Sequence, residues 1–69
     1  MSDIKLKVEF LAGTSFKQSL VEAKDLAVKL NVAYVTYNFN GIDVSIGQNA
    51  SLNMALQDFE DNKKHIVHS

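Results

Sequence analysis

The sequence contains no cysteine, and this absence removes several classes of function at once. Disulfides, thiol catalysis and cysteine-based zinc sites are all excluded. A secreted domain of 69 residues usually needs disulfides for stability, so we expect a cytoplasmic location. No apolar run approaches the ~18 residues of a membrane span, and the first residues do not resemble a signal peptide, so no membrane association is predicted.

Arginine is also absent, since all seven basic residues are lysines. Seven lysines against eight acidic residues give a net charge of −1. Proteins that bind nucleic acid through phosphate contacts need clustered cations, and arginine is the residue best suited to read guanine. A nucleic-acid partner is therefore not expected.

What is present is the composition of one ordinary globular domain. Apolar residues make up 46% of the chain and charged residues 22%, which is typical of a folded rather than a disordered chain. A chain of 69 residues leaves no room for a second domain. We therefore expect a single domain over residues 1–69.

The strongest local signal is a β-hairpin centred on Asn40-Gly41. This dipeptide tolerates the positive φ angles of a type I′ turn and lies between two alternating runs. A two-residue turn here fixes the register of the flanking strands. Three apolar pairs then share one face: Val35 with Ile46, Tyr37 with Val44 and Phe39 with Ile42.

The remaining elements follow from hydrophobic periodicity and capping signals. Residues 4–10 alternate perfectly, which indicates a strand. Ser15 and Gln18 fit a capping box at the start of an amphipathic helix, and Asn31 is a plausible C-terminal stop. The full prediction is strand 4–11, helix 15–30, strand 32–39, strand 42–47, helix 50–62 and a flexible tail 65–69.

This order predicts an α+β fold, a two-layer β-α-β-β-α domain. Each helix has one apolar stripe and each strand one apolar face, so both helices are expected on one face of a three-stranded mixed sheet. A right-handed crossover makes the first two strands parallel, and the hairpin makes the third antiparallel to them. We favour the strand order first, second, third.

Two surfaces remain for function. The outer face of the sheet is polar, and its candidate interaction residues are Lys5, Lys7, Tyr34, Thr36, Asn38 and Asp43. On the long helix, Val21 and Val28 fall outside the apolar stripe, nearly superposed, and are candidates for a partner or self-association seam.

We interpret the chain as a non-catalytic module that binds a protein partner of unknown identity, as an adaptor, inhibitor or accessory factor. No hydroxyl or carboxylate has a base at a fixed spacing, so an enzyme is not expected. No cofactor is predicted, and Asp61, His65 and His68 are read as a frayed tail rather than a metal site. Small cysteine-free domains are frequent in bacteriophages and mobile elements, which makes such an origin a further expectation.

Two alternatives stay open. The first is weak binding of single-stranded nucleic acid on the outer sheet face, through Lys5, Lys7 and Tyr34. The second is a structural role as a homo-oligomer, with a homodimer as its simplest form. Dimerisation covers apolar surface, which stabilises a domain of this size.

Overall fold

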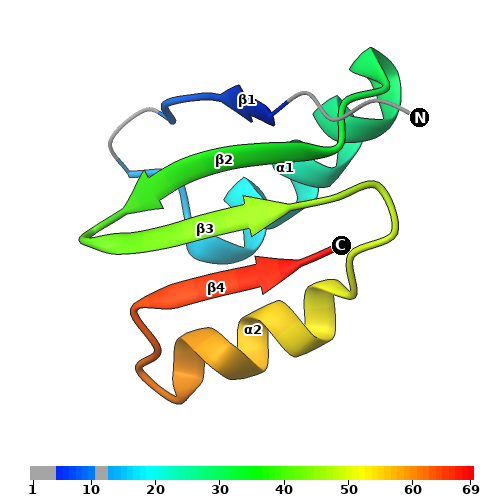
Figure 1. Ribbon diagram of the computed structural model, residues 1–69. Coiled ribbons are helices and arrows are strands. Elements are labelled where there is room, and N and C mark those ends of the chain that lie inside the picture. The colour runs from blue at the N-terminus through cyan, green and yellow to red at the C-terminus, as the bar shows by residue number, and fades with distance from the viewer. Residues whose placement is uncertain (1–4, 11–12) are drawn as a thin grey trace.

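Six helices and strands follow one another along the chain in the computed structural model, which describes residues 5–10 and 13–69. They are β1 (Lys5–Lys7), α1 (Phe16–Leu30), β2 (Tyr34–Phe39), β3 (Ile42–Ile46), α2 (Leu52–Glu60) and β4 (His65–His68). The strands form one mixed sheet, and the helices form a second layer against it (Figure 1). Among the described residues, neither helix has the length and apolar character needed to cross a membrane.

The hairpin between β2 and β3 has the predicted turn and the predicted register. Asn40 and Gly41 both adopt positive φ angles, 49° and 88°, as a type I′ turn requires. The side chain of Asn38 strengthens the turn, since its Oδ1 accepts a hydrogen bond from the backbone of Gly41 at 3.0 Å. The three predicted apolar pairs are confirmed: Val35 with Ile46, Tyr37 with Val44 and Phe39 with Ile42.

Helix α1 begins and ends where its capping residues predict. Ser15 is the N-cap, and its hydroxyl accepts a hydrogen bond from the backbone of Gln18 at 3.1 Å. Asn31 closes the helix in the left-handed conformation, with φ at 50°. Helix α2 starts after Ser51 and is shorter than the predicted span 50–62. Residues 4 and 11 of the predicted first strand lie outside the described residues, and β1 comprises the three residues Lys5–Lys7.

The sheet has four strands, so the expectation of three is corrected. The order is β1-β2-β3-β4, with β1 parallel to β2, β2 antiparallel to β3, and β3 parallel to β4. The order of the first three strands is as predicted. The fourth strand comes from the segment expected to be a flexible tail. It carries one inward apolar residue, Ile66, which is fully buried, so no alternating pattern marks it in the sequence.

Both helices cover the same face of the sheet. Helix α1 packs on β2 and β3, and α2 packs on β4 and against α1. Phe16 of α1 stacks on Phe59 of α2 with ring centroids 4.1 Å apart, and Phe39 of β2 meets both rings edge-on. This aromatic cluster joins the two helices to the sheet, and aromatic pairs of this kind add about 0.5–1.5 kcal/mol beyond simple burial.

The two β-α-β crossovers have opposite hands. The strands advance in one direction across the sheet, the hairpin reverses the chain, and both helices lie on one face. The first crossover is right-handed, so the second is left-handed (Figure 1). About 98% of such connections are right-handed. A right-handed second crossover would put the apolar stripe of α2 on the polar face of the sheet, so burial of that stripe favours the uncommon hand.

Side chains just before β4 and at its end contact Asp58 of α2, and the last residue of the strand extends the pairing with β3. The Nε2 of His68 lies 2.8 Å from Oδ2 of Asp58 on α2, and Nζ of Lys63 lies 3.1 Å from the other carboxylate oxygen. Hydrogen bonds from His68 and Lys63 lower the pKa of the Asp58 carboxyl. The backbone of Gly47 donates to the carbonyl of His68 at 2.8 Å, which extends the ladder past the end of β3.

Candidate functional site

The outer face of the sheet carries the polar side chains that the sequence places there. The register aligns Lys5 with Tyr34 and Lys7 with Thr36 across β1 and β2, and Asn38 with Asp43 across the hairpin. The Nζ of Lys5 lies 5.8 Å from the centre of the Tyr34 ring. Each sequence-predicted residue of this face is therefore in its expected place.

These polar groups mostly satisfy one another. Asn38 donates to the carboxylate of Asp43 at 3.2 Å, and the hydroxyl of Thr36 donates to the carbonyl of Leu6 at 3.5 Å. A shallow hollow of about 400 Å³ runs between Lys7 and His65 above these residues. The face is thus a shallow polar surface on which Asn38 and Asp43 bond each other.

The two histidines of β4 point to opposite faces of the sheet. His65 is exposed and lines the outer hollow beside Asp43, its partner in the register. His68 faces the helix layer and contacts Asp58. Because they are separated in this way, the two rings cannot share a ligand. The described part of the chain contains no group of three histidine or acidic side chains placed to hold a metal ion.

Val21 and Val28 lie on the exposed side of α1, as their helical spacing predicts. Their exposed fractions are 49% and 53%. With Leu52 they line a depression of about 340 Å³ between α1 and the start of α2. The Nζ of Lys24 donates to the carbonyl of Ala50 at 3.0 Å across the same junction. This depression lies on the helix layer and is not joined to the outer sheet face.

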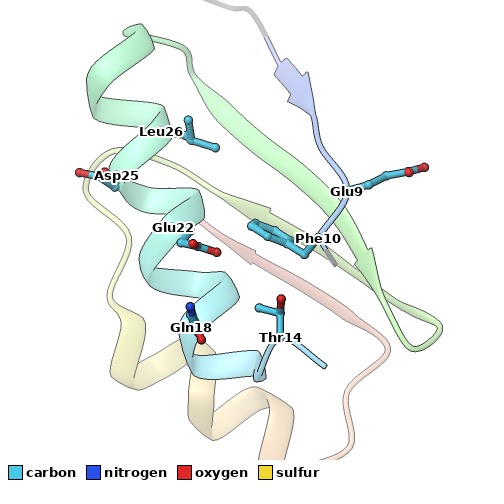
Figure 2. Close-up of a pocket in the computed structure, with 7 residues that line it drawn as sticks. All are labelled: Glu9, Phe10, Thr14, Gln18, Glu22, Asp25 and Leu26. Carbon is cyan, nitrogen blue, oxygen red and sulfur yellow. The ribbon is translucent and has the colours of Figure 1, made fainter. Parts of the chain in front are cut away.

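A further hollow in the described structure is one that the sequence prediction did not include. It is a groove of about 490 Å³ between the end of β1 and α1, which we call the β1–α1 groove (Figure 2). Its lining residues are Glu9, Phe10, Thr14, Gln18, Glu22, Asp25 and Leu26. Its volume falls within the range of roughly 300–1,000 Å³ typical of ligand pockets.

The groove exists because no described helix packs on β1. Helix α1 contacts β2 and β3 and makes no close contact with β1. The inward side chains of the β1 segment, Leu6, Val8 and Phe10, consequently remain only partly buried, although they pack against the core. Apolar surface on the inner face of the sheet is therefore left open at this edge.

The floor of the groove is rigid where it meets the core. The ring of Phe10 packs edge-on against Tyr37, with centroids 4.8 Å apart. The Tyr37 hydroxyl lies 2.9 Å from the buried hydroxyl of Ser19, which itself donates to the carbonyl of Phe16 at 2.6 Å. Burial raises the pKa of Tyr37 to about 12, only partly offset by the Ser19 hydrogen bond. The ring of Phe10 thus packs on a buried tyrosine whose hydroxyl is hydrogen-bonded to Ser19.

The charged residues of the groove are all acidic. Glu22 points from α1 toward Phe10, whereas Glu9 points outward from β1 at the mouth (Figure 2). Asp25 turns away from the groove, and its carboxylate pairs with Lys29 at 3.0 Å. Among the described residues, no lysine or histidine lines the groove. A cationic group entering it would meet the carboxylate of Glu22 without a competing positive charge from the lining residues.

The sequence contains a partial signal for this groove. Leu26 lies on the flank of the apolar stripe of α1, toward β1, and it is only half-buried. An apolar residue beside the main stripe indicates that the apolar surface of α1 is wider than the part covered by β2 and β3. The position of α1 over β2 and β3, which leaves β1 open, is not encoded in any local pattern.

Comparison of the chain with protein-family models, curated proteins and solved structures gave no significant match.

Proposed function

We propose that this chain is a small non-catalytic protein-binding module, and that its partner binds in the β1–α1 groove. The observation that carries the proposal is the groove itself, where Phe10, which follows β1, and Leu26 of α1 form a partly exposed apolar floor. Binding sites are typically hollows with an apolar lining and a few polar groups. Such a module acts as an adaptor or inhibitor by occupying a surface of its partner.

The lining of the groove favours binding over chemistry. Its polar groups are carboxylates, the Gln18 amide and the Thr14 hydroxyl, and among the described residues no hydrogen bond joins that hydroxyl to a carboxylate. Activation of a hydroxyl nucleophile requires a base within hydrogen-bonding distance. An apolar floor with a polar rim is instead the usual composition of a protein interface.

The test is a selection of random peptides displayed on phage against the immobilised chain. Selected peptides are titrated into ¹⁵N-labelled chain, and we expect the chemical-shift changes to cluster on Phe10, Glu22 and Leu26. The variant Leu26→Gln should weaken binding about tenfold, because it removes apolar contact worth roughly 1.4 kcal/mol.

The matched control is Val28→Gln, which changes an exposed apolar residue of the same helix outside the groove. It should alter affinity less than about twofold, and far-UV circular dichroism should show that both variants keep their helices. Shift changes that cluster on the outer sheet face or around Val28 would refute the groove as the site. Failure to recover any binding peptide would count against the function itself.

A further inference from the structure

Within residues 5–10 and 13–69, the arrangement of the helix layer leaves one helix position without a helix. Packed helices lie about 8–10 Å apart, whereas neighbouring strands are about 4.8 Å apart. Helix α1 covers β2 and β3, and α2 lies beside it at the β4 edge of the sheet (Figure 1). A third helix at the same spacing on the other side of α1 would lie under β1. The β1–α1 groove occupies this position.

The form of the groove fits a helix better than an extended strand. A helix presents an apolar stripe to a groove through residues spaced three and four apart, and here the stripe would meet Phe10 and Leu26. An added strand would pair with the backbone of β1 at the sheet edge, and the groove beneath would stay open. The exposed side chains of Lys5 and Lys7 at that edge also disfavour strand addition.

The charge of the groove defines the polar flank of such a helix. Glu22 points into the groove, whereas the carboxylate of Glu9 points away from it and that of Asp25 is paired with Lys29. Charge complementarity across an interface speeds association and selects the partner. We propose that the partner segment is an amphipathic α-helix that lies beside α1, with lysine or arginine on the flank that faces Glu22. This inference rests on the proposed function of the groove.

The test uses three synthetic peptides of about 18 residues with the same leucine stripe. One carries lysines on the flank beside the stripe, one carries glutamates there, and one is the lysine peptide with a central proline. Fluorescence anisotropy of the labelled peptides measures binding to the full chain. We expect the lysine peptide to bind at least about tenfold more tightly than the glutamate peptide, and more weakly as salt rises. Proline breaks a helix, so the third peptide should lose binding.

The variant Glu22→Lys should lower affinity for the lysine peptide and raise it for the glutamate peptide. Its matched control is Glu60→Lys, which makes the same charge change at an exposed position on α2. This control should change neither affinity more than about twofold. A reversal seen with Glu22→Lys alone supports a basic flank in contact with Glu22.

Each failure has a distinct meaning. Equal binding of the lysine and glutamate peptides would overturn the basic flank, and undiminished binding of the proline peptide would overturn the helix. If phage-selected peptides bind the groove while none of the three helical peptides does, the helical partner is refuted and the proposed function stands. If neither kind of peptide shifts the groove residues, the proposed function itself is refuted.

Discussion

Replacement of Gly47 by alanine tests how the last strand is held in place. A Cβ atom at this position would lie 2.8 Å from the carbonyl oxygen of Ser69 and 3.1 Å from that of Ala33. Both neighbours are backbone atoms, so a flexible side chain cannot simply move aside to relieve the clash. The carbonyl of Ser69 also accepts a hydrogen bond from the backbone of Asn49 at 3.0 Å. Relief of the clash by movement of Ser69 therefore lengthens or breaks that bond.

The expected cost follows from opposing effects. Overpacking of a close contact costs roughly 1–3 kcal/mol, and a lost hydrogen bond costs about 1 kcal/mol. Alanine also lowers the entropy of the unfolded chain, which offsets about 0.4–1 kcal/mol. We expect Gly47→Ala to lower the free energy of unfolding by about 1–3.5 kcal/mol. For a domain of this size, each 1 kcal/mol corresponds to a decrease in Tm of about 4–8 °C.

The assay is urea unfolding followed by circular dichroism, with each measurement repeated in a chain that lacks Ser69. Deletion of Ser69 removes the nearer of the two clashing groups, so Gly47→Ala should cost clearly less in the shortened chain, where only the contact with the Ala33 oxygen remains. The difference between the two backgrounds measures the contact directly. An equal cost in both backgrounds, or no cost in the full chain, would refute the close packing of Gly47 against the end of β4.

Two pH dependences should also be measurable. Because the pKa of Tyr37 is raised to about 12 in the folded state, only the unfolded chain ionises between about pH 10 and 12, and the free energy of unfolding should fall by up to about 2–3 kcal/mol over this range. Urea unfolding at each pH should show no such fall for Tyr37→Phe. If the variant keeps the same pH dependence, burial of Tyr37 is not its cause. Because hydrogen bonds from His68 and Lys63 lower the pKa of Asp58, its contribution is present above about pH 4 and is lost as the pH falls below that value. Asp58→Asn should therefore be less sensitive to acid than the wild-type chain in thermal unfolding, and identical acid profiles would argue against the Asp58–His68 contact.

The parts of the fold that could be predicted are those fixed by neighbours in the sequence. The turn at Asn40-Gly41 and the cap at Ser15 depend on a few adjacent residues, and both form as expected. Strand β4 could not be predicted, because its partner β3 lies about twenty residues earlier and its own segment has one inward apolar residue, Ile66. A parallel edge strand of this length leaves almost no local pattern.

The candidate site divides in the same way. The outer sheet face and the exposed valines of α1 follow from period and register, so each lies where the sequence predicts. The β1–α1 groove depends on which strands α1 covers, a choice made by the aromatic contacts of Phe16 with Phe39 and Phe59. With these contacts formed, α1 packs beside α2 and over β2 and β3, and it leaves β1 uncovered. In the sequence, the groove is indicated by Leu26, which is apolar and lies beside the main stripe of α1.

The opposite hands of the two crossovers bear on the origin of the domain. Residues 5–39 and 42–68 each run strand, helix, strand, which suggests a duplicated unit. A duplicated segment keeps its handedness, however, and no rotation superposes a right-handed crossover on a left-handed one. The two halves therefore cannot be superposed as two copies of one structural unit. Each is a separate solution to covering the same face of one sheet.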